Sequence, residues 1–243
     1  MAKLTPLIGF HAVTARLKRH PDSVGSIYCS SEREDARLTK LLELATAQAI
    51  TVHKVPRARL DGMAPSGRHQ GVVAMVSELP ALVSAQDLLA HLEHPPLVLV
   101  LDGITDPHNF GACLRSADAF GADCVIVPKD GAAPLNEVVA KAASGAMESV
   151  PIVHATNLVR AIEELKAMDI WVYGAAGEAQ TTLTALKPAA RAAYILGAEG
   201  DGMRRLTREH CDALFHLPMQ GTVESLNVSV ATGIVLYQHR NFT

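Results

Sequence analysis

From Pro96 onward, the chain alternates between short apolar runs and longer amphipathic segments. The apolar runs include PLVLVLD, DCVIVP and AAYILG, which are hydrophobic along most of their length. Segments such as NLVRAIEELKAM lie between them and repeat their apolar residues at helical spacing. Strands without a polar face are buried on both sides, and strands separated by helices usually run parallel. We therefore predict an α/β fold with a mostly parallel sheet covered by helices on both faces.

A smaller α/β unit is predicted before this sheet, over residues 1–78. This unit carries 11 Lys and Arg against 7 Asp and Glu, a net charge of +4. Residues 79–243 carry 11 Lys and Arg against 18 Asp and Glu, a net charge of -7. A basic front unit suits polyanion binding, although a chance imbalance on a solvated surface fits the charges equally well. Residues 79–96 contain three prolines around one short helical pattern, and we take them as the linker to residues 97–243.

A polar loop, DGMAPSGRHQ, lies between two predicted strands of the front unit. Its Arg68 and His69 are candidates for contact with an RNA backbone. The alternative is an ordinary surface loop, because loops of this composition are common at surfaces.

The composition excludes several classes of protein. About half of the 243 residues are hydrophobic (49%), yet no apolar run approaches the ~20 residues of a membrane span. The N-terminal sequence MAKLTPLIGF lacks the pattern of a signal peptide. The four cysteines show no C-x-x-C pair. We therefore expect a reduced, cytoplasmic protein with no membrane partner.

Three loops at the carboxyl edge of the predicted sheet combine turns with polar side chains, and ligands of open parallel sheets bind at that edge. The first is LDGITDPHNFGACLRSADAFG, where a helix starting at Asn109 carries Arg115. The second is ILGAEGDGM, which places Glu199 among glycines. The third is LPMQGTVESLNVSVATGIVLYQ, residues 217–238.

The third stretch is predicted to start a helix. Ser225 and Asn227 are residue types that cap helix N-termini, because their side-chain oxygens accept from unpaired backbone N–H groups. We expect the apolar side of this helix to pack on the core. That side consists of Val230, Gly233, Ile234 and Tyr237.

The sequence does not contain the residue spacings of the common nucleotide-binding, hydrolase and metal-binding motifs. GAEGDG is not G-x-G-x-x-G, and the chain holds neither a phosphate-binding G-x-x-x-x-G-K-[ST] loop nor a G-x-S-x-G elbow. Four histidines lack the spacing of metal ligands, and we predict no metal site. These are His108, His154, His210 and His216.

Taken together and in this order, the stretches NFGACLRSADAFG, ILGAEGDGM and LPMQGTVESLNVSVA resemble the three motifs of the SpoU class of SPOUT RNA methyltransferases. The resemblance covers residues 97–240. GFHAV and HQGVVA are similar to that class's ribosomal-protein-like substrate-binding domain, which is a small α/β domain. The resemblance implies a trefoil-knotted parallel-sheet domain at the C-terminus. It also implies a homodimer whose site is partly completed by the other subunit.

The resemblance further implies S-adenosyl-L-methionine as cofactor, bound by main chain of the knotted loops. The matching positions are Gly197, Leu217 and Leu226, with Met219 nearby. Glycine permits close approach to backbone, and apolar residues suit an adenine. Transfer from the sulfonium leaves a neutral sulfur, so this chemistry needs no metal.

Arg115 matches the arginine to which the family assigns the central catalytic role. Its guanidinium has a pKa above ~12, so fixing a phosphate and stabilising a developing alkoxide fits it better than acting as a base. His108 has a suitable pKa for a base but matches a variable position, and ranks below Arg115. The resemblance implies that four polar residues orient the ribose and Arg115, although capping or a helix-start carboxylate explains several of them. These are Asn109, Glu199, Ser225 and Asn227.

In length and domain order the chain most resembles the members that methylate a guanosine ribose of 23S rRNA, in the peptidyl-transferase P loop. The implied partner is free 23S rRNA or the assembling large ribosomal subunit. Two alternatives remain: a tRNA 2′-O-methyltransferase of the same fold, and a non-catalytic RNA-binding assembly factor. The basic front unit favours rRNA, and the presence of Arg115, Asn109 and Asn227 favours catalysis.

Overall fold

The computed structural model describes residues 4–64, 69–78 and 84–242. The chain divides into two compact units, Met1–Ala81 and Leu82–Thr243. Residues 79–83 of the predicted linker lie outside the described residues. The remainder of that linker contains helix α4 (Ala85–Leu89), which contributes two buried residues to the core of the second unit.

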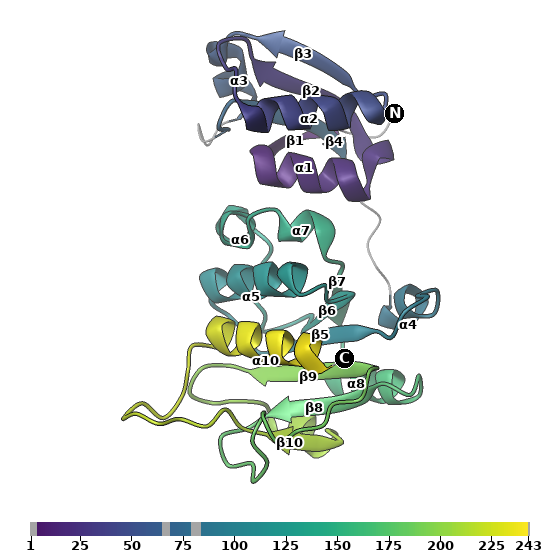
Figure 1. The fold of residues 1–243 in the computed structure, drawn as a ribbon, viewed down its shortest axis with the longest axis vertical. Coiled ribbons are helices and arrows are strands. Elements are labelled where there is room, and N and C mark those ends of the chain that lie inside the picture. Colours follow the sequence, from purple (N-terminus) through teal and green to yellow (C-terminus); the bar gives the residue numbers. More distant parts are fainter. Residues whose placement is uncertain (1–3, 65–68, 79–83, 243) are drawn as a thin grey trace. The chain divides into compact units, whose positions relative to one another are not determined.

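The first unit is a four-stranded mixed sheet in the order β1-β4-β2-β3 (Figure 1). Among the described strands of this unit, β2 and β3 pair in parallel, and the other two pairs are antiparallel. Alternate strand residues face opposite sides, so α1 and α2 pack on one face, and α3 packs with the other. A single-turn helix, η1 (Pro21–Ser23), precedes β2. The other elements are β1 (Leu4–Ile8), α1 (Phe10–Arg19), β2 (Val24–Ser30), α2 (Ala36–Ala47), β3 (Thr51–Val55), α3 (Arg57–Met63) and β4 (Val72–Ser77).

The polar loop predicted over residues 61–70 differs from the expectation. Its start belongs to α3, and residues 65–68, which include Arg68, lie outside the described residues. His69 is only 1% exposed, and so the expectation of a free contact residue is wrong. Its Nδ1 accepts from the Gly71 N–H at 3.0 Å, which leaves Nε2 to donate to Asp61 Oδ1 at 2.9 Å. His69 therefore links Asp61 of α3 to Gly71, which precedes β4.

The second unit is a six-stranded sheet in which every pair is parallel, in the order β10-β8-β9-β5-β6-β7. The predicted parallel sheet is confirmed. β9 follows β8 along the chain but lies between β8 and β5, which brings the carboxyl ends of β5 and β9 side by side. The strands are β5 (Leu97–Asp102), β6 (Cys124–Pro128), β7 (Ile152–Ala155), β8 (Trp171–Ala175), β9 (Ala192–Gly197) and β10 (Ala213–Phe215).

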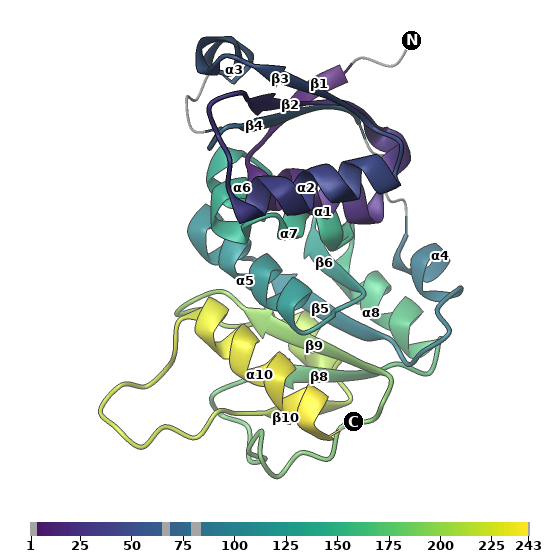
Figure 2. The same ribbon diagram turned by 45° about the horizontal axis from the view of Figure 1, so that its top comes forward.

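Helices cover both faces of this sheet, as Figure 2 shows. Leu97, Leu99 and Leu101 of β5 point into a core shared with α5, α6, α7 and α10. The alternate residues Val98 and Val100 point into a second core shared with α4 and α8. Burial on both sides explains the unbroken apolar runs. The remaining helices are α5 (Pro107–Ala119), α6 (Glu137–Ala143), α7 (Ala146–Ser149), α8 (Leu158–Lys166), α9 (Arg205–Glu209) and α10 (Val228–Phe242).

The final helix presents a different face to the core from the one predicted. Val230, Ile234 and Tyr237 are 50%, 39% and 58% exposed, so the expected inward stripe faces outward. The buried face includes polar Thr232 and His239, which bond inside the protein. Thr232 Oγ1 donates to the Val228 carbonyl at 2.8 Å, and His239 Nδ1 lies 3.1 Å from the Tyr194 hydroxyl. Satisfied polar residues are tolerated in a core, and an apolar pattern alone does not detect them.

No helix within the described ranges is both long enough and apolar enough to cross a membrane.

Candidate active site

The site is built at the carboxyl edge, beginning with the loop that follows β5. Asp106 Oδ1 accepts from the His108 N–H at 2.9 Å, and Pro107 occupies the first position of α5. Proline is favoured there because that position needs no N–H partner inside the helix. This cap fixes the start of α5 and places Asn109 in its first turn, at the edge of the sheet.

Three residues from three distant segments form one hydrogen-bonded cluster. Asn227 Nδ2 donates to Asn109 Oδ1 at 2.9 Å and also to Glu199 Oε1. Asn109 Nδ2 lies 3.4 Å from the same Glu199 oxygen. The Val228 N–H also donates to it at 3.3 Å. We call Asn109, Glu199 and Asn227 the polar cluster.

The polar cluster is held by the start of α10. Asn227 Oδ1 accepts from the Ser229 N–H at 3.0 Å and from the Ser229 hydroxyl at 2.6 Å, which caps the helix. A carboxylate such as that of Glu199 is favoured at a helix N-terminus, where the backbone N–H groups concentrate positive charge. Glu199 and Asn227 are exposed and Asn109 is half-buried, so the cluster is both ordered by hydrogen bonds and open to a ligand.

The loop after β9 crosses its own backbone at Gly197. A Cβ built on Gly197 would overlap the backbone of Gly202 and Met203, so only glycine fits there. Ala198 and Gly202 exchange hydrogen bonds of 2.9 and 3.1 Å, which close the loop on itself. The loop carries Glu199 and therefore links the predicted cofactor position at Gly197 to the polar cluster.

The other predicted cofactor positions offer apolar surface. Leu217, Met219 and Leu226 are each half-buried, and Leu217 packs against the core that contains α5 and α10. Leu226 directly precedes Asn227 of the polar cluster. Half-buried apolar side chains beside exposed main chain fit a ligand with an adenine, because such pockets combine apolar walls with a few polar groups.

The structure leaves two predicted catalytic residues outside the polar cluster. Arg115 lies six residues after Asn109, which is about 9 Å along the helix axis and about 120° around it. Its side chain is exposed, and in the described part of the chain it makes no hydrogen bond or ion pair. Ser225 is likewise exposed, without a hydrogen bond to any described residue. His108 is exposed on the outer side of α5.

Sequence reasoning missed a buried ion pair beside the site. Asp102 ends β5, and its carboxylate is fully buried. One oxygen accepts from the Arg204 N–H at 2.9 Å, and the other lies 3.5 Å from Arg204 Nε. The contact ties the end of the glycine loop to β5. The sequence could have indicated this pair, because Asp102 is a lone carboxylate at the end of an apolar strand, and a buried charge needs a partner.

Burial also perturbs a thiol beneath the polar cluster. Desolvation raises the pKa of Cys113 to about 11, while a hydrogen bond with Thr232 opposes that rise. Cys113 therefore stays a neutral thiol at neutral pH and serves as packing between α5 and α10. Over the described ranges, no group of three or more His, Cys, Asp and Glu residues is placed to hold a metal ion.

The fold defines the class of protein. The SpoU methyltransferase AviRb from Streptomyces viridochromogenes superposes with a TM-score of 0.76 at 21% identity, over 99% of this chain and 90% of that one. Its complex with the cofactor AdoMet superposes with a TM-score of 0.75, over 98% and 90% of the two chains at 21% identity. The chain thus has the fold of these solved SpoU methyltransferases, and the predicted α/β fold class is confirmed.

The sequence identifies the family. The SpoU rRNA Methylase family model matches residues 96–237, and a model for RNA 2'-O ribose methyltransferase substrate binding matches residues 6–82. This chain belongs to the SpoU rRNA methylase family. It is 50% identical over 238 residues to the 23S rRNA (guanosine-2'-O-)-methyltransferase RlmB of Ralstonia nicotianae, covering 98% of this chain and 96% of that protein. The protein of the same name from Neisseria meningitidis is 48% identical, over 99% and 96% of the two chains.

Proposed function

We propose that this protein transfers a methyl group from S-adenosyl-L-methionine to the ribose 2′-hydroxyl of a guanosine in 23S rRNA. The observation that supports this most strongly is the polar cluster beside the Gly197 loop, in a chain about half identical to relatives named for that activity. The similarity spans both units, which favours an rRNA substrate like that of the relatives. Ribosomal RNA as substrate implies a cytoplasmic protein.

The cofactor supplies a methyl group bound to a positively charged sulfur. We assign its binding to the main chain at Gly197 and to the apolar surface of Leu217, Met219 and Leu226. The tight crossing at Gly197 fixes the path of this backbone, and a fixed path keeps the donated methyl in one position.

The polar cluster orients the acceptor ribose. Three N–H groups fix one oxygen of Glu199, which leaves the second oxygen to accept from a ribose hydroxyl. Asn109 and Asn227 hold that carboxylate in place, while Ser225 lies on the exposed segment just before α10. Arg115 supplies a planar, permanently charged fork, which suits a phosphate of the RNA and the negative charge that develops on the attacking oxygen.

Arg115 does not contact the polar cluster of its own chain. In a dimer, the Arg115 of one copy would lie at the polar cluster of the other copy. Val230, Ile234 and Tyr237 form an exposed apolar stripe on α10, which neighbours α5. Exposed apolar patches often mark protein interfaces. We therefore assign this stripe to a homodimer in which each site is completed by its partner.

Light scattering tests the dimer. We expect two copies per particle for the native protein and a monomer of reduced activity for Ile234→Glu. Leu135→Glu is the control, since Leu135 is an exposed apolar residue outside α10 (43% exposed). A native monomer with full activity would contradict the assignment.

Methyl incorporation tests the activity itself. Purified protein and labelled S-adenosyl-L-methionine are incubated with an unmodified 23S rRNA transcript, with a bulk tRNA transcript pool as the second arm. We expect a single 2′-O-methylguanosine in the 23S rRNA digest and no product on tRNA. Product on tRNA alone would support the tRNA-modifying alternative, and no product on either RNA would support a non-catalytic binding role.

A further inference from the structure

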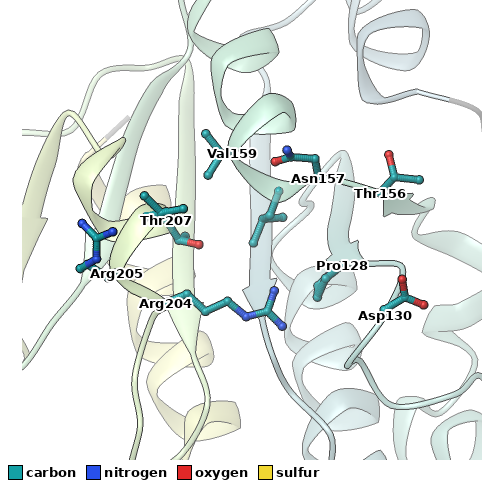
Figure 3. A pocket seen from close by; sticks show the side chains of 10 residues that line it. Pro128, Asp130, Thr156, Asn157, Val159, Arg204, Arg205 and Thr207 are labelled. Carbon is teal, nitrogen blue, oxygen red and sulfur yellow. The ribbon is translucent and has the colours of Figure 1, made fainter.

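A pocket of about 510 Å³ opens at the carboxyl edge of the second unit, and its lining includes no residue of the polar cluster (Figure 3). It lies between the ends of β6 and β7, the start of α8, and α9. Its apolar wall includes Pro128 and Val159, and its polar wall includes Asp130, Arg204 and Arg205. The volume is that of a small-molecule site and accommodates one nucleotide.

The start of α8 turns unpaired backbone donors toward this pocket. Asn157 caps the helix, with its Oδ1 accepting from the Arg160 N–H at 3.1 Å. The N–H groups of Leu158 and Val159 precede that bond and have no carbonyl partner within the helix. Both residues line the pocket. Helix starts of this kind bind phosphate well.

Two arginines line the opposite wall, and only Arg204 reaches across toward the start of α8, whereas Arg205 points away from it in Figure 3. Arg204 holds its Nε 3.5 Å from the buried Asp102 carboxylate and extends its guanidinium across the pocket toward Pro128, as Figure 3 shows. Arg205 pairs with Glu209 on the same helix, at 2.6 Å, and its side chain is 71% exposed. Exposed pairs of this type contribute little to stability, so Arg205 is free to turn to a ligand.

The same wall also carries a hydroxyl group that makes no hydrogen bond to any described residue of the protein. Thr207 is only 2% exposed and lines the pocket, and its side-chain oxygen points toward the interior in Figure 3. Its hydroxyl has no hydrogen-bond partner anywhere in the described ranges. This hydroxyl is therefore available to a ligand in the pocket, as donor or as acceptor.

We propose that this pocket binds one ribonucleotide of the RNA substrate, flanking the nucleotide that is methylated. Its phosphate lies between the start of α8 and the two arginines, and a ribose hydroxyl lies at Asp130. The carboxylate of Asp130 repels a free phosphate ion but accepts from a hydroxyl, which favours a nucleotide of RNA over a bare anion. The proposal rests on RNA as the substrate of the neighbouring site.

The test compares two exposed Arg–Glu pairs of the same spacing on the full-length protein. Arg205 lines the pocket, whereas Arg160 pairs with Glu164 at 2.9 Å, has a side chain that is 79% exposed, and lies outside the pocket. The dissociation constant for a 23S rRNA transcript is measured for Arg205→Ala and Arg160→Ala. We expect Arg205→Ala to raise it roughly 10-fold, as for loss of a charge-assisted hydrogen bond, and Arg160→Ala to leave it unchanged. Arg204 is left intact because it neutralises buried Asp102.

Two further variants separate the pocket from general charge. Val159→Trp fills the pocket without changing charge and should weaken rRNA binding as much as Arg205→Ala, with an unchanged melting temperature and cofactor affinity. Asp130→Ala should weaken binding of a single-stranded RNA oligonucleotide but not of DNA of the same sequence. Equal losses for Arg205→Ala and Arg160→Ala, or normal rRNA binding by a folded Val159→Trp protein, would overturn the proposal. Because the readout is RNA affinity, its failure is distinct from a failure of methyl transfer.

Discussion

Replacing Gly197 by alanine adds one methyl group to the protein, and we expect this change to disable cofactor binding. The added Cβ would lie well inside 3.0 Å of the backbone of Gly202 and Met203, a separation that real Cβ atoms essentially never show. All three of the nearest atoms belong to the peptide group that joins Gly202 to Met203, so no side-chain rotation relieves the overlap. The two strands of the loop must therefore separate by roughly 1 Å to restore ordinary van der Waals contact.

The cost follows from that separation. Overpacking of this kind destabilises by ~1–3 kcal/mol. Separation also stretches the two hydrogen bonds between Ala198 and Gly202, each contributing about 1 kcal/mol. We expect the free energy of unfolding to fall by about 3 kcal/mol. The dissociation constant for S-adenosyl-L-methionine should rise at least ~10-fold, because the loop to which we assign its binding has moved.

Gly177→Ala is the matched control, because a Cβ at Gly177 meets no atom within 4 Å. That variant should be neutral or slightly more stable, since alanine restricts the unfolded chain. Calorimetric titration with S-adenosyl-L-methionine and urea unfolding are run on both variants. A Gly197→Ala protein with native stability and native cofactor affinity would refute the assigned role of this crossing.

Other substitutions test separate parts of the account. Arg115→Ala should lower methyl transfer to unmodified 23S rRNA at least ~100-fold. Its melting temperature should change little, because the Arg115 side chain is exposed and makes no bond to any described residue. Arg115→Lys should also have low activity, and near-native turnover of the alanine variant would rule out a catalytic role. Burial lowers the pKa of His239 to about 4, below the ~6.5 of an unfolded histidine, so its stabilising contribution is present above pH 6.5 and is lost as the pH falls toward 4. The free energy of unfolding should fall by about 2 kcal/mol between pH 7 and pH 5, and an equal fall in His239→Gln would refute this origin. A protein starting at Ser84 should remain folded and bind cofactor but lose most rRNA affinity, with salt dependence reduced; equal rRNA binding by the truncated and full-length proteins would contradict the role given to the first unit.

The parallel sheet was predictable because burial on both faces leaves a direct trace in sequence. Leu97 to Leu101 contribute alternate residues to two separate cores, so no polar residue interrupts the run. The break between α6 and α7 left a weaker trace, the dipeptide Ser144-Gly145, which is of a type that marks turns. Ser144 adopts a φ of 51° and Gly145 a φ of 97°, which end one helix and start the next. A non-glycine residue in that conformation depends on tertiary packing.

The orientation of α10 was mispredicted for a related reason. Thr232 is buried with its hydroxyl bonded to the Val228 carbonyl of its own helix and beside Cys113 of α5, and His239 is buried beside the Tyr194 hydroxyl, so apolar residues are left on the outer face. A pattern of apolar residues gives the side of a helix that prefers burial, but not whether the core or a second copy of the chain covers it.

The polar cluster and the pocket depend on contacts between segments far apart in the chain. Asn109, Glu199 and Asn227 were selected from motifs, but their mutual hydrogen bonds arise from the adjacency of β5 and β9 and from the cap of α10. Arg115 was also selected from a motif, but within one chain it does not join the polar cluster. The pocket joins α8 to α9, segments that no local pattern relates.

The most direct measurement is a map of 2′-O-methyl groups on 23S rRNA from cells with and without this gene. We predict that one guanosine of 23S rRNA loses its methyl group in the deletion strain. A native copy of the gene should restore that group, and an Arg115→Ala copy should not. An unchanged methylation map of 23S rRNA, or full restoration by the Arg115→Ala copy, would contradict the account.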